Sequence, residues 1–317
     1  MRKILVTGAL GQIGSELVVK LREIYGKDNV VASNRSKKDG QEKVIEGGPF
    51  ELLDIRDANR LNEIIDKYDI NTIINLAAIL SAVGEAKPLD CWDVNMNGLY
   101  TILEICRQRN IMLFNPSSIA AFGPSTPADN TPQDTIQRPT TMYGVTKVAG
   151  EILCDYYHQR FGVDTRGVRF PGLISYETLP GGGTTDYAVH IYYEAIKNKK
   201  YTSFIAPGTR MDMMYMPDAI DSIIELMEAD SEKLIHRNAF NITAMNFTPE
   251  EIAASIKKFI PEFEIDYDVD PVRQKIAESW PNSLDASAAR DEWGYVPKYD
   301  LDKMTKDMLE KLSEKLK

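Results

Sequence analysis

The sequence has little cysteine and little histidine, with three residues of each among 317. A disulfide framework needs paired cysteines, and a zinc site needs clustered ligands. The cysteines are odd in number and widely spaced, at Cys91, Cys106 and Cys154, and the histidines are just as scattered. We therefore expect buried thiols in a reducing cytoplasm, and no metal site.

Long apolar runs and an excess of positive charge are also missing. No stretch reaches the roughly 18 consecutive apolar residues of a membrane-spanning helix. The first letters, MRKILVTGAL, run straight into glycines, so we interpret them as a strand and not as a secretion signal. The formal net charge of −10 gives no general attraction for nucleic acid or an anionic membrane. We expect a cytoplasmic protein that acts on a small molecule.

Short apolar runs alternate with longer amphipathic ones through the N-terminal half of the chain. Strands that alternate with helices and are apolar throughout are typical of a parallel sheet covered on both faces. The alternation includes one long predicted helix at 91–110 and a predicted strand at 164–172. The predicted fold class is α/β: a Rossmann-type doubly wound parallel sheet with a smaller α/β C-terminal lobe. The expected boundaries are 1–173 plus about 217–243 for the main domain, and about 174–216 plus 244–317 for the lobe.

Three glycines lie between the first predicted strand and the first predicted helix. Gly8, Gly11 and Gly14 follow the spacing G-x-x-G-x-x-G, and not the G-x-G-x-x-G of ordinary dinucleotide domains. Glycines let the backbone turn tightly and approach a pyrophosphate, and the helix N-terminus offers free N–H groups and partial positive charge. This position favours a dinucleotide-binding turn over a purely structural one.

The second predicted strand ends near the residues that would contact the adenosine ribose. An acid there accepts hydrogen bonds from the ribose hydroxyls and selects NAD. Here Asn34 can still bond a hydroxyl, while Arg35 either pairs with a 2′-phosphate, which favours NADP, or points to solvent. We expect NAD, with NADP as the less favoured cofactor. Asp54 and Ile55, after the third strand, are expected beside the adenine.

A tyrosine and a lysine one helical turn apart suggest acid–base chemistry. Tyr143 and Lys147 begin a predicted helix, and Ser117 and Ser118 end the preceding strand. Carboxyl ends of parallel strands form the ligand crevice of such sheets. We predict that Tyr143, its pKa lowered by the Lys147 ammonium, takes the proton of an alcohol while hydride passes to nicotinamide, and that Ser118 holds the substrate oxygen. The alternative is a core tyrosine beside a solvated lysine.

These residues together resemble a known family. Gly8, Gly11, Gly14, Ser118, Tyr143 and Lys147 match the extended short-chain dehydrogenase/reductase pattern of the nucleotide-sugar epimerase-like branch. Within it, segments such as RFPGLISY, PGGGTTDYAV, MMYMPDAI and ESWPNSLDASAAR resemble the short-chain L-threonine 3-dehydrogenases. The resemblance implies NAD-dependent oxidation of the C3 hydroxyl of L-threonine to 2-amino-3-ketobutyrate, without a metal. The family usually has Asp where this chain has Asn34.

The resemblance also implies a full set of site residues and a dimer. The expected cofactor-binding residues cluster at strand ends: Gly8, Gly11, Gln12, Ile13, Gly14, Asn34, Arg35, Asp54, Ile55, Leu76, Ala77, Ala78, Asn95, Pro116, Tyr143, Lys147 and Phe170. The expected substrate-binding residues are Ser81, Ser117, Ser118, Tyr143, Thr184, Thr185 and Trp280. Asp186 either attracts the substrate ammonium or caps the following helix. Helices around 92–106 and 151–161 are expected to form a four-helix homodimer seam.

Two other functions stay open at this point. A nucleotide-sugar epimerase or dehydratase on the same scaffold needs a basic pocket for a diphosphate, and Arg210, Arg273 and Arg290 are available in the C-terminal half. A non-catalytic dinucleotide-binding regulator would have lost the Ser/Tyr/Lys set, which is present here.

Overall fold

The computed structural model describes residues 3–178 and 183–317. The chain divides into two compact units. The first contains the chain up to Ala121 together with Thr141–Arg169 and Ser222–Phe240, and the second contains Phe122–Thr140, Phe170–Asp221 and Asn241–Lys317. Which lobe binds cofactor and which binds substrate stays a prediction.

The first unit is built on a six-stranded parallel sheet in the order β3–β2–β1–β4–β5–β7. Its strands are β1 (Ile4–Thr7), β2 (Val30–Asn34), β3 (Phe50–Leu52), β4 (Thr72–Asn75), β5 (Met112–Phe114) and β7 (Thr165–Arg166). Thr7 lies in register with Ser33 on one side and Asn75 on the other, so the carboxyl ends of the central strands are level. This arrangement confirms the predicted doubly wound α/β fold.

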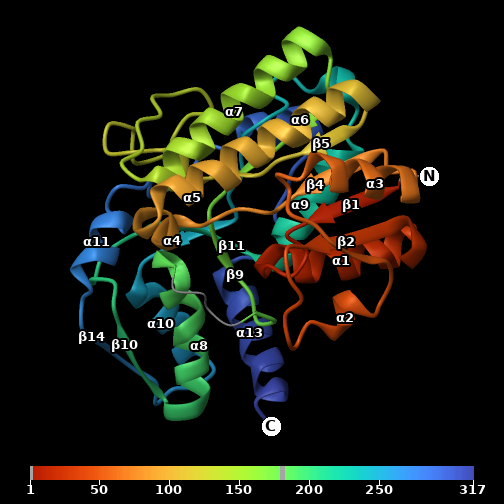
Figure 1. Ribbon diagram of the computed structural model, residues 1–317. Coiled ribbons are helices and arrows are strands. Elements are labelled where there is room, and N and C mark those ends of the chain that lie inside the picture. Colours follow the sequence, from red (N-terminus) through yellow and green to blue (C-terminus); the bar gives the residue numbers. More distant parts are fainter. Residues whose placement is uncertain (1–2, 179–182) are drawn as a thin grey trace. The chain divides into compact units, whose positions relative to one another are not determined.

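Helices cover both faces of this sheet (Figure 1). On one face, Leu5, Val31 and Ile73 pack against α3, α6 and α7 in a buried core. On the other face, Ile4 and Ile74 contact α1 and the C-terminal part of α9, as the alternation of side chains along a strand requires. The helices and helical turns of this unit are α1 (Gln12–Tyr25), η1 (Lys27–Asn29), α2 (Glu42–Ile45), α3 (Ala58–Tyr68), α4 (Ser81–Ala86), α5 (Pro88–Trp92), η2 (Asp93–Asn97), α6 (Gly98–Arg109), η3 (Ile119–Ala121), α7 (Met142–Phe161), part of α9 (Met216–Glu228) and η5 (Ser231–Lys233).

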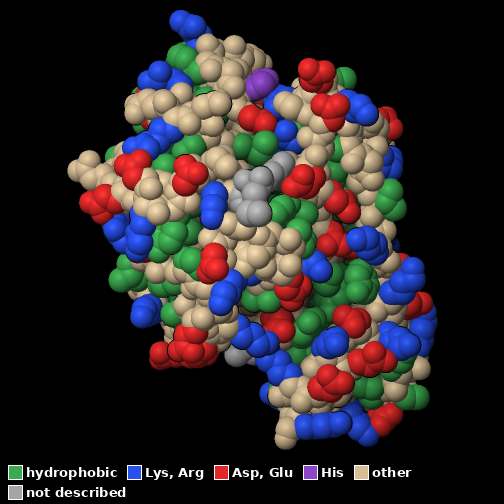
Figure 2. Space-filling view, turned by 90° about the vertical axis from the view of Figure 1, so that its right-hand side faces the viewer, with side chains coloured by type: hydrophobic (Ala, Val, Ile, Leu, Met, Phe, Trp, Pro, Cys, Tyr) green, Lys and Arg blue, Asp and Glu red, His purple; other side chains and the backbone are tan. Residues whose placement is uncertain are grey.

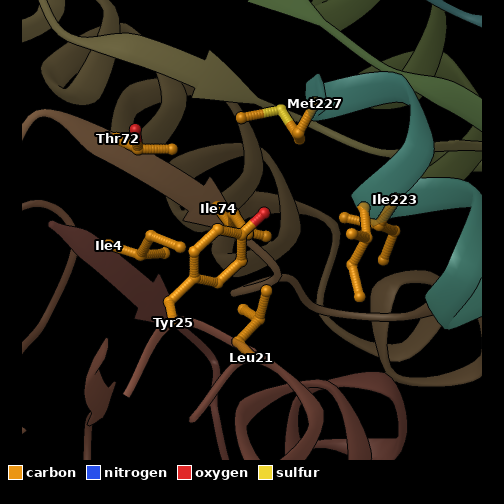
Figure 3. A pocket seen from close by; sticks show the side chains of 8 residues that line it. Ile4, Leu21, Tyr25, Thr72, Ile74, Ile223 and Met227 are labelled. Carbon is orange, nitrogen blue, oxygen red and sulfur yellow. The ribbon is translucent and has the colours of Figure 1, made fainter. Parts of the chain in front are cut away.

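A small cavity of about 10 Å³ lies between this second face and its helices. Figure 3 shows its lining, in which Tyr25 and Leu21 of α1 face Ile223 and Met227 of α9. The space holds about one water, and its lining is almost wholly apolar. None of the predicted site residues lines it, so it is a packing gap and not a ligand site.

The helix that carries Tyr143 and Lys147 has well-formed ends. Thr141 is extended at the N-cap, and its hydroxyl accepts a hydrogen bond from the Gly144 N–H at 3.1 Å. Gly162 ends the helix in the left-handed conformation. A hydroxyl cap and a C-terminal glycine are strong stop signals. The first turn of α7, which carries the tyrosine, is therefore fixed by its own sequence.

Two predicted elements are more fragmented than expected. The predicted helix at 91–110 is interrupted by a π-helical turn, Asp93–Asn97. The predicted strand at 164–172 divides into β7 (Thr165–Arg166), β8 (Val168–Phe170) and β9 (Gly172–Ile174), which belong to three different sheets. Between β7 and β8, the Gly167 N–H bonds to Arg237 and not to a neighbouring strand of the main sheet. Pro171, between β8 and β9, has no N–H to donate. A third sheet has the order β12–β8–β6, with β6 (Ser117–Ser118) and β12 (Phe240–Asn241).

The second unit surrounds its own apolar core. A three-stranded sheet in the order β13–β11–β9 and a parallel pair β10–β14 accompany helices α8, α10 and α13, which pack on one another. Thr248 and Glu251 form a capping box with Pro249 in the first turn of α10, which confirms the predicted helix start. The bounds are η4 (Thr184–Asp186), α8 (Tyr187–Asn198), β10 (Lys200–Ser203), β11 (Met211–Tyr215), β13 (Met245–Phe247), α10 (Pro249–Lys257), β14 (Glu264–Tyr267), α11 (Pro271–Ala277), α12 (Ser287–Trp293) and α13 (Leu301–Lys315).

The charges on the visible face are mixed, and the cysteines are buried. Figure 2 shows acidic and basic side chains interspersed on the face it presents. Cys91, Cys106 and Cys154 are buried and free, which confirms the expected buried thiols. In the described ranges, no helix is long and apolar enough to cross a membrane, and no group of three or more metal-binding side chains occurs.

Candidate active site

The glycine turn between β1 and α1 is packed tightly against the end of β4. Gly8 has a φ of +66°, and a Cβ there would lie 2.7 Å from the Ala77 nitrogen. A Cβ at Gly14 would lie 2.5 Å from the Gly8 carbonyl oxygen. Any side chain at these two positions would therefore force the turn apart, which explains the glycines by backbone geometry.

The N-terminus of α1 is suited to hold a phosphate. Gly11 is its N-cap, and within the described chain no side chain caps this end and no acid lies in its first turn. The first N–H groups of a helix have no acceptor inside the helix, so those of Gln12, Ile13 and Gly14 can bond an anion. This donor set fits the diphosphate of a dinucleotide.

The predicted adenosine end lies at the carboxyl ends of β2 and β3. The Asn34 side-chain amide donates to the Ser36 carbonyl at 2.8 Å, and Arg35 is exposed. Arg56 donates to both carboxylate oxygens of Asp54, at 2.9 and 2.6 Å, and holds the pKa of that carboxyl at about 2. Ile55 is buried against Gly98 of α6. Asp54 thus stays ionised and bound to its neighbour.

Asn95 connects three elements at the end of β4. Its side chain accepts from the Ile79 N–H at 2.8 Å and donates to the Ile79 carbonyl at 3.0 Å. It also donates to the Thr146 hydroxyl of α7 at 3.1 Å. The π-helical turn carries this residue, as π-turns commonly do at functional sites. The segment Leu76–Ala78, half-buried and preceding Ile79, is held between β1 and Asn95.

The three predicted catalytic residues meet at the start of α7. The Ser118 hydroxyl acts on the Tyr143 hydroxyl by lowering its pKa, and it accepts a hydrogen bond from the Ala120 N–H at 3.2 Å. The Lys147 ammonium donates to the Pro116 carbonyl at 2.8 Å and lies 5.3 Å from the centre of the Tyr143 ring. Lys147 is therefore not a solvated surface lysine. The alternative of a core tyrosine beside a solvated lysine does not describe this geometry.

The charge states of this pair differ from the sequence-based expectation. Burial raises the pKa of Tyr143 to about 12, and the effect of the Ser118 hydroxyl only partly offsets this. Burial lowers the pKa of Lys147 to about 8, opposed by the nearby Glu151 carboxylate. The expectation that the ammonium lowers the pKa of Tyr143 is wrong, because the removal of the phenol from water raises this pKa and is the larger effect. Lys147 still carries its charge for the most part at neutral pH.

A buried ion pair that the sequence motifs do not predict lies one helical turn beyond Lys147. Glu151, one turn further along α7, accepts from Arg169 of β8 at 3.1 and 2.9 Å, and both side chains are less than 8% exposed. The Ser117 hydroxyl also donates to Glu151. Glu151 follows Lys147 by four residues, a spacing that places both on one helix face. That spacing was the available signal, but nothing in the sequence pairs it with Arg169.

The predicted substrate contacts from the first unit occupy different surroundings. Ser117 is buried and bonded to Glu151, whereas Ser118 is half-buried beside Tyr143. Ser81 begins α4 and lies one turn from Gly84, where a Cβ would be 3.9 Å from the Tyr143 Cβ. The structure thus places Ser81 on the face of α4 that packs toward Tyr143. The substrate contacts themselves stay predictions.

The remaining predicted site residues belong to the second unit. Phe170 and Thr184 are buried, Trp280 is half-buried, and Thr185 packs against Gly172. The short turn η4, which carries both threonines, contacts α11 just before Trp280. Asp186 stands at the N-cap position of α8, as predicted, but its carboxylate accepts from the Gly183 N–H at 2.6 Å and makes no cap bond to α8. The rest of the glycine-rich loop, 179–182, lies outside the described residues.

Three arginines that a diphosphate pocket would need have partners within the second unit. Arg210 donates to Glu251 at 2.7 Å and to Asn246. Arg273 lies 4.3 Å over the Phe204 ring and 3.5 Å from Asp270. Arg290 lies 3.9 Å from Asp285. Their charges are thus at least partly compensated by the protein itself.

Comparison with known proteins gives consistent matches along the chain. A family model described as the NAD dependent epimerase/dehydratase family matches residues 4–243. An uncharacterized epimerase/dehydratase of Staphylococcus saprophyticus is 58% identical, over 100% of this chain and 99% of its own length.

Two solved structures are similar over nearly the whole chain. L-threonine dehydrogenase from Clostridium difficile is 69% identical with a TM-score of 0.98, over 99% of this chain and 98% of that one. A monomeric L-threonine 3-dehydrogenase from a metagenome, in its apo form, is 45% identical with a TM-score of 0.93, over 99% and 100%. These matches confirm the resemblance drawn from the motifs.

Proposed function

The chain belongs to the NAD dependent epimerase/dehydratase family, and from that premise we propose that it oxidises the C3 hydroxyl of L-threonine to 2-amino-3-ketobutyrate with NAD. The observation that carries the proposal is the cluster of Ser118, Tyr143 and Lys147 in the same unit as the glycine turn. The similarity to L-threonine dehydrogenases over nearly the whole length supports the choice of substrate.

Side chains of the protein accept the proton that the substrate hydroxyl loses. In the proposed reaction Tyr143 first loses its own proton to solvent, and the phenolate oxygen then accepts the proton of the C3 hydroxyl while the Ser118 hydroxyl holds the substrate oxygen. A bound nicotinamide would supply the hydride acceptor, and the N–H groups of Gln12, Ile13 and Gly14 would hold the diphosphate of the dinucleotide. No metal takes part in this proposal.

Lys147 holds a positive charge beside the ring of the base. Its hydrogen bond to the Pro116 carbonyl fixes the ammonium, and Glu151 keeps it protonated against the cost of burial. A fixed cation at this distance favours the phenolate that forms when Tyr143 gives up its own proton. The same ammonium can donate to the nicotinamide ribose, which orients the ring for hydride transfer.

We assign recognition of the amino acid to small polar side chains and one tryptophan. Ser81, on the Tyr143-facing side of α4, is proposed to meet the carboxylate, with Thr184 and Thr185 as further hydroxyl donors. Trp280, in the second unit, is proposed as a further substrate contact. The cost of binding a zwitterion is met only if both charged groups find partners.

The second candidate is a nucleotide-sugar epimerase or dehydratase, favoured by the family description and the name of the Staphylococcus relative. Such a substrate brings a diphosphate, which needs basic groups that are free to bond it. Arg210 is already bonded to Glu251 and Arg273 is stacked on Phe204 beside Asp270. We therefore rank this function below threonine oxidation.

We also propose that the protein forms a homodimer through α6 and α7. Tyr100, Ile152 and Tyr156 are large apolar side chains that are more than half exposed. Tyr100 and Tyr156 each contact Tyr157 edge-on, at 6.3 and 6.0 Å between ring centres, so the exposed groups form one patch across the two helices. The helices lie side by side in Figure 1. A monomer is the other outcome, since one similar enzyme is described as monomeric.

The experiment for substrate is a panel of steady-state assays of dinucleotide reduction. L-threonine, D-threonine, L-serine and a sugar nucleotide are each offered with NAD and with NADP. We expect activity with L-threonine, weaker or absent activity with D-threonine, and none with the sugar nucleotide. Turnover of the sugar nucleotide alone would replace this proposal with the second candidate.

A further inference from the structure

Strand β2 ends in an amide side chain and not in a carboxylate. An acid at this position accepts from the ribose 2′- and 3′-hydroxyls and repels a 2′-phosphate. Here the strand ends in Asn34, whose amide bonds to the Ser36 carbonyl. The charge of Arg35 contributes to the lowered pKa of Asp54, whose carboxylate is held by Arg56 at 2.9 and 2.6 Å. The usual acid is therefore replaced by Asn34 and the Asp54 charge is compensated by Arg56, while the exposed Asp39, four residues after Arg35, is the next acid along the chain.

Basic side chains follow directly. Arg35, Lys37 and Lys38 are exposed. In the described ranges, Arg35 forms no hydrogen bond or ion pair and acts only through its electrostatic effect on Asp54. The Lys38 ammonium donates to the Leu10 carbonyl, inside the glycine turn, at 3.2 Å. The basic segment thus reaches from the ribose end of the crevice to the phosphate turn.

A buried arginine holds the rest of this segment in place. Arg22 of α1 donates to the carbonyls of Val44 at 2.6 Å and Pro49 at 2.8 Å, with a longer contact to Val30 at 3.4 Å. Gly48 packs on its guanidinium, since a Cβ there would lie 2.7 Å from the Arg22 Nε. Arg22 therefore anchors the part of this connection next to β3, and the Lys38 bond to Leu10 anchors the part that follows β2. Such anchoring reduces the entropy that a loop loses when it binds a ligand.

We infer that Arg35, with Ser36 and Lys37, forms an anion subsite for the 2′-phosphate of NADP, so that the protein binds NADP as well as NAD. A guanidinium pairs with a phosphate through two parallel N–H bonds, and the Ser36 hydroxyl is a further donor. The Asn34 amide can still bond a ribose hydroxyl, so NAD is not excluded. The inference rests on the dinucleotide site of the proposed function and is independent of its substrate.

Direct binding of NADH and NADPH to the full chain, followed by nucleotide fluorescence, tests this without any substrate. We expect dissociation constants within about tenfold of each other. Loss of a charge-assisted bond should weaken NADPH binding by about tenfold or more in Arg35→Ala, with NADH changed less than about twofold. Asn34→Asp should shift the preference in the same direction. Lys43→Ala on α2 removes one exposed charge outside the subsite and is the matched control.

Each outcome of this experiment has a separate meaning. NADH binding without NADPH binding, or equal losses of both ligands in Arg35→Ala, overturns the subsite. A loss in Lys43→Ala equal to that in Arg35→Ala also overturns it, because net charge alone would then explain the effect. Binding of both nucleotides without threonine oxidation leaves the subsite intact and refutes the proposed substrate.

Discussion

Replacing Glu151 with glutamine tests the charge network behind the proposed catalytic lysine. The substitution keeps the size of the side chain and leaves the Arg169 guanidinium buried without its carboxylate, after two bonds at 3.1 and 2.9 Å. Breaking a buried ion pair from one side costs about 3–5 kcal/mol. We therefore expect the free energy of unfolding in urea to fall by about that amount, which is a large part of a typical total.

The same change should act on Lys147. The Glu151 carboxylate raises the pKa of Lys147 against burial, which sets it at about 8. Without the carboxylate this pKa falls further, so a smaller fraction of Lys147 is charged at neutral pH. We expect kcat to fall at pH 7, where the wild-type lysine is mostly protonated.

Two further variants test whether burial of the Glu151–Arg169 pair causes the loss of stability in Glu151→Gln. Glu63→Gln removes one of the two carboxylate partners of Arg60, at 2.9 Å in an exposed pair, and no measurable loss of stability is expected. Arg169→Met in the Glu151→Gln background removes the second buried charge and should recover at least half of the lost stability. The reasoning is refuted if Glu151→Gln costs no more than Glu63→Gln, or if the double variant is no more stable than the single one.

Three other predictions follow from the charges and surfaces described above. Activity needs the Tyr143 phenolate and the charged Lys147 together. Because the pKa of Tyr143 is about 12, the phenolate fraction grows about tenfold per pH unit, and because the pKa of Lys147 is about 8, the charged fraction of the lysine falls equally above that pH. Thus kcat should rise about tenfold per pH unit below pH 8 and level off above it; a flat profile would contradict a phenolate base. Burial raises the pKa of Asp212 to about 7, despite bonds from Thr243 and Leu284. The native state therefore binds an extra proton between pH 4 and pH 7, and the free energy of unfolding should fall by about 4 kcal/mol at most as the pH rises over that range. Asp212→Asn should flatten that dependence in urea titrations, and an unchanged slope would refute it. Ile152→Lys should convert a dimer into a monomer in light-scattering measurements while Ile24→Lys, an exposed apolar site on α1, should not; a monomeric wild type would end the proposal.

The sequence predicts best what depends on neighbours along the chain. The glycine turn, the six parallel strands, and the one-turn spacing of Tyr143 and Lys147 all follow from local patterns, and the structure has each of them. The Thr141 cap shows why α7 is regular: its hydroxyl bonds the Gly144 N–H three residues later. Local chemistry of this kind is readable because both partners stand close together in the sequence.

What the sequence does not predict depends on distant partners. Arg169 meets Glu151 only because β8 and α7 are packed together, and no spacing rule pairs residues 18 apart on different elements. The direction of the Tyr143 pKa shift follows from burial, which is a property of the folded chain. The division of 164–172 among three sheets depends on partners such as Arg237, which bonds the Gly167 N–H.

The most direct test of the account is Tyr143→Phe, which removes the oxygen that accepts the proton and keeps the ring. We predict that kcat with L-threonine falls by at least about a hundredfold, since a positioned general base is worth 10²–10⁴ in rate. The dissociation constant for NADH should stay within about twofold. A variant that keeps more than about a tenth of the wild-type kcat would contradict Tyr143 as the base.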